Sequence, residues 1–395
     1  MNIDAYVDYL IHLLRCAIKG NIPNSFPSDL DFADFFKLCK IHKLENIVYV
    51  MLKKTDMSYI AEEEAKKLET AYFQTLMVAA TQAHYQDMVE KAFEENDIDY
   101  LVLKGKELSM LYPQSVVRQS ADFDIYVGRE NAQRAKKIMQ NIGFSAEHYS
   151  EDENHDEYII NKWVLCELHR VLIQGDYPWK KGCNKIVDNL ILADGTSHCY
   201  KMSKENFYVY NLAHVAKHMK LSGIGIRAFL DMEVIYKKYK ESFDYEYLDA
   251  KLIECNLKEF DKNTRLLCEY WFEGKEDVSP AIKTFASYVV SSGWIGTAEQ
   301  LVATEAAMNA GKTNSTLFAK AKKCINIVMS PYETMVERYP VLKKHKWLTP
   351  IYRVRRGVSA IVKKRDLIKS VTSTIDETSI DEGKELLKFK ESIGL

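Results

Sequence analysis

Apolar residues recur at helical spacing over most of the first 95 residues. Between Ala5 and Ile18 they stand three or four positions apart, and Gly20 closes that segment. Residues 58–95 contain no Gly or Pro and are rich in Ala, Glu, Lys, Met and Gln, which are good helix formers. The pattern therefore predicts one long helix at 58–95, preceded by shorter helices at 30–44 and 47–54.

The pattern changes to that of strands near Ile98. The run Ile98–Leu103 is short and apolar and ends at Lys104-Gly105, which is typical of a buried strand. Residues 122–127 (DFDIYV) alternate acidic and apolar side chains, which is the period of a strand. Further elements are expected as helices at 107–112 and 130–141, a strand at 144–149, and two strands within 158–171.

Helical spacing returns after Ser203 and predicts an α+β chain. A small mixed sheet at 96–200 is expected between helical regions at 1–95 and 201–329, followed by a basic segment and polar tail at 330–395. The helices expected in the third region lie at 203–220, 226–240, 245–255, 262–272, 280–291 and 297–308.

Composition narrows the class of protein. The 395 residues are 47% hydrophobic and 28% charged, which excludes a mainly disordered chain. Lys and Arg number 54 against 56 Asp and Glu, a balance that argues against a whole-chain nucleic-acid coat. The eight cysteines form no CxxC pair, so a zinc ribbon is not expected. No transmembrane segment and no signal peptide are apparent, which together predict a reduced, cytoplasmic setting.

The residues with the clearest chemistry are acids on predicted strands. Asp122 and Asp124 stand two apart, so both side chains leave the same face of their strand. Carboxylates placed in this way repel each other unless a cation lies between them, and Mg²⁺ suits such oxygen ligands. Glu167 stands among apolar residues, and on an antiparallel neighbouring strand it would complete a three-carboxylate site. The alternative is that all three acids are exposed and form ordinary ion pairs.

The order of several short motifs resembles a known family. The chain is similar, over residues 30–355, to the uncharacterised nucleotidyltransferase family of the DNA polymerase β-like nucleotidyltransferase superfamily. The matching residues are Leu103-Lys104-Gly105, Tyr112-Pro113, Arg118, Asp122-Phe123-Asp124, Glu167-Leu168-His169, His214, His218, Arg227, Asp231, Arg338-Tyr339-Pro340 and Trp347-Leu348-Thr349-Pro350. The resemblance implies that the mixed sheet is a nucleotidyltransferase palm.

The resemblance implies transfer of a nucleoside monophosphate from an NTP, by default ATP, to an acceptor hydroxyl or amine. The acceptor is left open between a small molecule, a sugar, a protein and a tRNA. Two Mg²⁺ ions, with Mn²⁺ as an alternative, would be held by Asp122, Asp124 and Glu167, and Glu167 could instead act as general base. The implied nucleotide-binding residues are Lys104, Gly105, Lys106, Arg118 and Ser120. The implied acceptor-binding or supporting residues are His169, His214 and His218.

Two other function classes remain open. Lys106 stands where the family usually has Gly or Ser, which favours a catalytically idle palm that binds nucleotide or acts as a scaffold. The segment 343–365 carries nine Lys or Arg and no acid, so it could bind an anionic partner such as RNA, tRNA or a lipid surface, or dock on the body of the protein.

Three weaker signals have simple structural interpretations. His214 and His218 share one helix stripe and could be an ordinary pair at a helix contact. Arg227 and Asp231, four residues apart, are expected to form an ion pair within their helix. Residues 306–313 match a relaxed phosphate-loop pattern, but the helix expected at 297–308 makes Gly311 its C-terminal cap instead.

Overall fold

The computed structural model describes residues 3–113, 118, 120, 122–148, 155–161, 164–293 and 377–395. The chain divides into two compact units. The first comprises Met1–His218, Ile224–Trp294 and Ile393–Leu395, and the second comprises Met219–Gly223 and Ile295–Ser392. The sheet and every site residue discussed below belong to the first unit. The predicted helix at 297–308 and the basic segment 343–365 lie outside the described residues.

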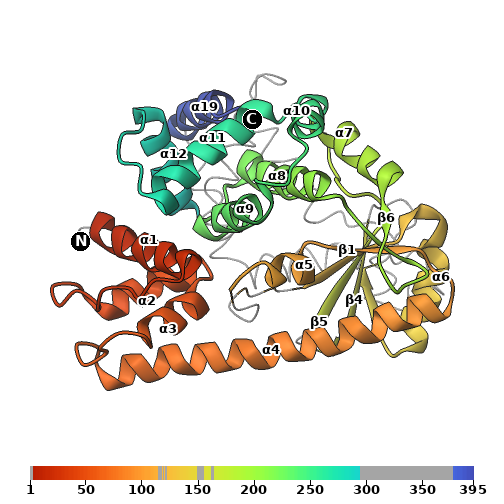
Figure 1. Ribbon diagram of the computed structural model, residues 1–395, viewed down its shortest axis with the longest axis horizontal. Coiled ribbons are helices and arrows are strands. Elements are labelled where there is room, and N and C mark those ends of the chain that lie inside the picture. The colour runs from red at the N-terminus through yellow and green to blue at the C-terminus, as the bar shows by residue number, and fades with distance from the viewer. Residues whose placement is uncertain are drawn as a thin grey trace. The chain divides into compact units, whose positions relative to one another are not determined.

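The N-terminal region is helical, as its spacing predicts. Asp31 caps the second helix by accepting a hydrogen bond from the backbone N–H of Asp34. The last of these helices, α4, is 34 residues long and runs from the N-terminal helices along the sheet (Figure 1). The helices are α1 (Ile3–Lys19), α2 (Phe32–Ile41), α3 (Glu45–Leu52) and α4 (Glu62–Glu95).

A mixed sheet follows α4, with the seven strands in the order β3-β4-β5-β2-β1-β7-β6. Strand β2 pairs in parallel with β5 and antiparallel with β1, and β1 pairs in parallel with β7. The strands are β1 (Tyr100–Leu103), β2 (Phe123–Tyr126), β3 (Ser145–His148), β4 (His155–Asn161), β5 (Val164–His169), β6 (Ile191–Leu192) and β7 (Cys199–Lys201). Together with the helices, this sheet confirms the predicted α+β fold class with a small mixed sheet.

Helices α4 and α6 (Gly128–Asn141) bury one face of the sheet. Phe93 of α4 and Met139 of α6 pack with Phe123 and Ile125 of β2 in one hydrophobic core. Because successive side chains of a strand point to opposite faces, Asp124 lies on the other face of the sheet. The core therefore fixes which side of β2 presents the carboxylates.

The chain after the sheet is again helical. The single helix predicted at 262–272 is instead α11 followed directly by a π-helical turn, η3. Part of the predicted polar tail forms helix α19, in the second unit. The elements are α7 (Lys180–Asn184), η2 (Lys185–Asn189), α8 (Lys204–Leu221), α9 (Ile226–Tyr239), α10 (Tyr245–Glu254), α11 (Lys258–Cys268), η3 (Glu269–Glu273), α12 (Pro280–Ser292) and α19 (Glu377–Ser392). In the described part of the chain, no helix has the length and apolar character to cross a membrane.

Candidate active site

The strand register brings the predicted acids to one face of the sheet. Asp124 of β2 lies directly opposite Glu167 of β5. The two strands are parallel, not antiparallel as the sequence interpretation assumed, but neighbouring residues in register still project from the same face. Asp122 precedes β2 by one residue and stands two positions before Asp124. Glu167, which is more than 40 residues from Asp122 and Asp124 in the sequence, is thus brought beside Asp124 by the pairing of two adjacent strands.

Two cationic side chains lie against the buried carboxylate of Asp124. The ammonium group of Lys104 is 3.4 Å from Asp124 Oδ2. The ring of His169 donates from Nε2 to Asp124 Oδ1 at 3.0 Å, and the same nitrogen is 3.4 Å from Glu167 Oε2. Lys104 immediately follows β1 and has φ 22° and ψ −61°, a strained conformation for a residue with a side chain. The strain marks the turn between β1 and helix α5 (Gly105–Met110), next to the acids.

These neighbours separate the pKa values of the two aspartates. Burial and then repulsion from Asp124 raise the pKa of Asp122 to about 6. Burial also acts to raise the pKa of Asp124, but Lys104 and His169 outweigh it and hold that pKa below its usual range. Burial acts to lower the pKa of His169, while its bonds to Asp124 and Glu167 raise it to about 9. At neutral pH the site holds an ionised Asp124 beside a protonated His169.

Helix α8 contributes a second group of polar residues. Lys104 Nζ is 2.9 Å from His214 Nε2, and the Nε2 atoms of His214 and His218 are 3.4 Å apart. Burial, reinforced by Lys104, lowers the pKa of His214 well below its usual value, so its ring is neutral and accepts from the ammonium group. Burial lowers the pKa of His218 to about 4. Both predicted histidines are therefore uncharged, and His214 is the one that lies against Lys104.

Sequence reasoning missed Lys217, which also belongs to this group. Burial and then the charge of Lys104 lower the pKa of Lys217, and the carboxylates of Glu167 and Asp124 partly offset them. Its position three residues after His214 was a usable signal, because residues at that spacing share one helix surface.

Gly105 and Ser120 meet beside Asp122. The Ser120 hydroxyl donates to the backbone carbonyl of Asp122 at 2.7 Å. A Cβ atom on Gly105 would lie 3.8 Å from the same hydroxyl oxygen. The turn after β1 and Ser120 are therefore adjacent beside Asp122.

The other two predicted nucleotide-binding side chains have partners elsewhere. Lys106 donates to Asp87 at 2.9 Å and to Glu90 at 3.0 Å, both on α4. Arg118 donates to both carboxylate oxygens of Asp231 on α9, at 2.9 and 3.1 Å.

Asp231 also accepts a hydrogen bond from the Tyr112 hydroxyl at 2.6 Å. Both partners in these contacts, Tyr112 and Arg118, lie between α5 and β2 in the sequence, and the pair of Asp231 with Arg227 stays a prediction. Arg118 and Asp231 therefore connect the segment before β2 to helix α9.

The donor atoms in the cluster suit a divalent cation. One atom each from Asp124, Glu167 and His169 lie within 4.8 Å of one another. Carboxylate oxygens are the ligands that Mg²⁺ prefers. Asp124 and Glu167 therefore fit a divalent metal ion together with His169, whereas Asp122, two positions before Asp124, is not part of this close group.

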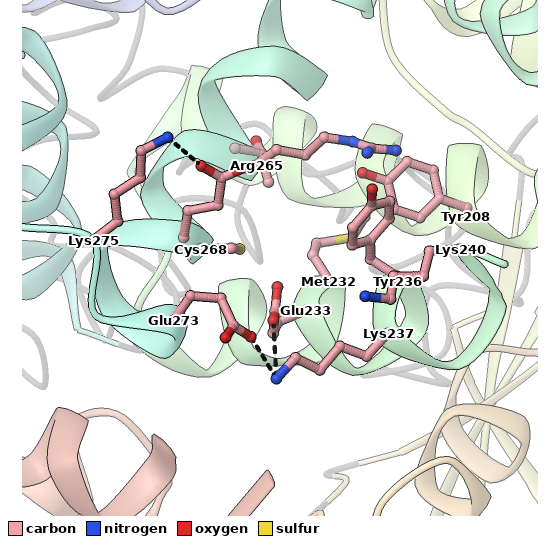
Figure 2. Close-up of a pocket in the computed structure, with 12 residues that line it drawn as sticks. Tyr208, Met232, Glu233, Tyr236, Lys237, Lys240, Arg265, Cys268, Glu273 and Lys275 are labelled. Atoms are coloured by element: carbon pink, nitrogen blue, oxygen red, sulfur yellow. Dashed lines mark hydrogen bonds and ion pairs between the residues drawn. The ribbon is translucent and has the colours of Figure 1, made fainter. Parts of the chain in front are cut away.

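A separate cavity of about 360 Å³ lies in the helical region (Figure 2). Its lining residues belong to α8, α9, α11 and η3 or follow them closely, so it is not the carboxylate site. Arg265 lies over the ring of Tyr236, 3.8 Å from its centroid. Lys237 binds Glu273 at 2.6 Å, and Lys275 binds Glu269 at 2.9 Å. Much of the charge around this cavity is thus already paired within its wall.

Fold and site together define an α+β protein with a carboxylate cluster on the face of a mixed sheet opposite α4 and α6. Comparison with known families gives a more specific assignment. The family described as "Uncharacterised nucleotidyltransferase" matches residues 28–273, more than half of the chain. The chain belongs to this family, as its sequence motifs predict. No curated protein and no solved structure matched it.

Proposed function

We propose that the protein is a Mg²⁺-dependent nucleotidyltransferase that moves a nucleoside monophosphate from an NTP, by default ATP, to an acceptor hydroxyl or amine. The observation that supports this proposal is the register of Asp124 beside Glu167 on adjacent strands, with Asp122 two positions before Asp124, in a chain of this family. The acceptor stays open between a small molecule, a sugar, a protein and a tRNA.

The reaction requires an acceptor nucleophile to attack the α-phosphorus of the NTP. The bond from the α-phosphorus to the nucleophile forms, the bond to pyrophosphate breaks, and the acceptor loses one proton. Asp122, Asp124 and Glu167 would hold Mg²⁺, which would neutralise phosphate charge and activate the acceptor. Glu167 is the more exposed of the paired acids, with 23% of its side chain accessible against 8% for Asp124. As the alternative to metal binding, Glu167 is therefore the better placed of the two to take the acceptor proton as general base, with Asp122 and Asp124 alone holding the ion.

The basic residues have distinct proposed roles. Lys104 lies at the strained turn where the triphosphate would approach, and its ammonium group would stabilise negative charge on the transferred phosphoryl group. His169 would hold Asp124 and Glu167 in position through its Nε2 atom. His214 would orient Lys104 by accepting from its ammonium group. Gly105 and Ser120 would leave room for the phosphates beside Asp122.

The position of the transferred label tests this reaction class. The full chain is incubated with Mg²⁺, a cell extract and NTP labelled at either the α- or the γ-phosphate. Label from the α-phosphate should appear on an extract component, and label from the γ-phosphate should appear in pyrophosphate. The reaction should disappear in Asp124→Asn and persist in the control Asp194→Asn, whose side chain is 99% exposed. Transfer of the γ-phosphate would contradict the proposal.

A second candidate is a nucleotide-binding protein without turnover. The observation that favours it is Lys106, which stands where the family usually has Gly or Ser. Its ammonium group donates to two acids of helix α4 and not toward the site of the phosphates. Metal-dependent NTP binding that survives Glu167→Gln, without label transfer, would support this candidate. The RNA- or tRNA-directed alternative depends on segment 343–365, outside the described residues.

A further inference from the structure

Helix α8 carries a row of polar side chains toward the carboxylate site, and two of them have no role in the proposed reaction. Residues three, four and seven positions apart on a helix share one surface. Tyr210, His214 and Lys217 have this spacing on α8. His214 lies 2.9 Å from the ammonium group of Lys104, which is itself 3.4 Å from Asp124. The surface of α8 that carries Tyr210 and Lys217 therefore faces the site.

Tyr210 is a buried side chain with an unsatisfied hydroxyl. Only 2% of the residue is exposed. Within the part of the chain that the structure describes, its hydroxyl has no hydrogen-bond partner. Burial and then the charge of Asp124 raise the pKa of this hydroxyl, so it stays protonated and can donate. A buried donor without a partner is unfavourable unless a water or a ligand accepts from it.

Lys217 is a half-buried cation that also lacks a partner. Among the described residues it forms neither a hydrogen bond nor an ion pair. The charge that acts on it most is that of Lys104, followed by those of Glu167 and Asp124. The two ammonium groups repel each other, and Asp124 already pairs with Lys104. An anion bound by both lysines would replace this repulsion with attraction.

We propose that Tyr210 and Lys217, together with Lys104, form a subsite for a phosphate-type oxyanion beside the carboxylate cluster. The deprotonated oxygens of such an anion only accept hydrogen bonds, which suits two ammonium groups and a hydroxyl. His214 is uncharged and accepts from Lys104, so it does not repel the anion.

The inference deepens the proposed function and rests on it for the source of the anion. That source would be the phosphates of the NTP or an anionic group of the acceptor. Binding of the anion requires no transfer, so the subsite can be tested separately from the reaction.

Isothermal titration calorimetry of the full chain with inorganic pyrophosphate, in a buffer containing Mg²⁺, tests the subsite. Lys217→Met should weaken binding by about 10–100-fold, the range expected for loss of a hydrogen bond to a charged group. Lys217→Arg keeps the charge and should bind more tightly than Lys217→Met. The control Lys238→Met removes an exposed lysine of helix α9 and should bind as the wild type does.

A second variant separates binding from a structural role. Tyr210→Phe keeps the buried ring and removes only the unpartnered hydroxyl, so its Tm should not fall. Its affinity for pyrophosphate should nevertheless fall by about 10-fold. The proposal is wrong if the wild type shows no saturable binding, or if either Lys217→Met or Tyr210→Phe binds with wild-type affinity.

A nucleotide that cannot be transferred identifies the source of the anion. If α,β-methylene ATP displaces pyrophosphate and binds Lys217→Met more weakly, the subsite holds the phosphates of the NTP. If pyrophosphate binds beside the analogue, the subsite holds an anionic group of the acceptor. Binding that depends on Lys217 in a protein without label transfer would refute the proposed function alone. Label transfer with unchanged pyrophosphate affinity in Lys217→Met would refute the subsite alone.

Discussion

The ion pair between Arg118 and Asp231 should be a large contributor to stability. Both side chains are buried, with 7% and 13% of their surface exposed, and Asp231 also accepts from Tyr112. Asp231→Asn removes the charge and leaves a buried guanidinium group without its counterion. Breaking a buried pair in this way costs roughly 3–5 kcal/mol. For a body of roughly 290 residues, that free energy corresponds to a fall in Tm of about 5–8 °C.

Thermal unfolding followed by circular dichroism measures this cost. The matched control is Asp249→Asn, which makes the same change in an exposed ion pair with Lys258 and should cost less than about 1 kcal/mol. Replacing both partners, as Arg118→Met/Asp231→Leu, should cost less than Asp231→Asn alone because the Arg118 guanidinium group is then no longer buried without its counterion. Equal Tm values for Asp231→Asn and Asp249→Asn would refute the reasoning.

Three further predictions follow from single side chains. Burial lowers the pKa of His42 from 6.5 to about 4 in the folded protein. As the pH falls, the unfolded chain therefore takes up the proton before the folded chain does. The free energy of unfolding should fall by about 3 kcal/mol between pH 6.5 and pH 4. Urea unfolding at several pH values should show a smaller fall for His42→Gln. Ile125→Ala empties a fully buried position behind Asp124 and should lower the free energy of unfolding by about 2–5 kcal/mol, whereas Ile253→Ala, at a 58% exposed position, should change it little. Lys104→Met should slow nucleotide transfer by about 10²–10³-fold, and an unchanged rate would exclude the proposed role of its charge.

The regular elements of the fold could be predicted because their patterns are local. Helix α4 has no Gly or Pro over 34 residues, and strand β2 shows the period of two. Strands β6 and β7 have only two and three residues, too few for a period to appear. Strand β7 joins the sheet by pairing Cys199 with Tyr100, a contact between distant parts of the chain that no local pattern encodes.

The candidate site shows the same division between local and distant information. The spacing of Asp122 and Asp124 places both on one strand face, but the strand that pairs with β2, and its direction, depend on the whole sheet. Asp231 stands four residues after Arg227, which favoured a pair within the helix. Asp231 also accepts hydrogen bonds from Arg118, which stands 113 residues away in the chain, and no local spacing indicates that contact.

The start of strand β4 was predicted wrongly for a different reason. The predicted strands began at Tyr158, whereas β4 begins at His155. The predicted boundary was three residues too late, so His155 and Glu157 fell outside the predicted strand.

Pyrophosphate release is the most direct measurement of the central claim. The full chain, Mg²⁺, an NTP mixture and a cell extract are combined with the wild type, Asp122→Ala/Asp124→Ala or the exposed control Asp194→Asn. The account predicts release by the wild type and by Asp194→Asn, and none above background by the double variant. Release by the double variant at the wild-type rate would contradict it, because the carboxylates of β2 would then have no part in the reaction.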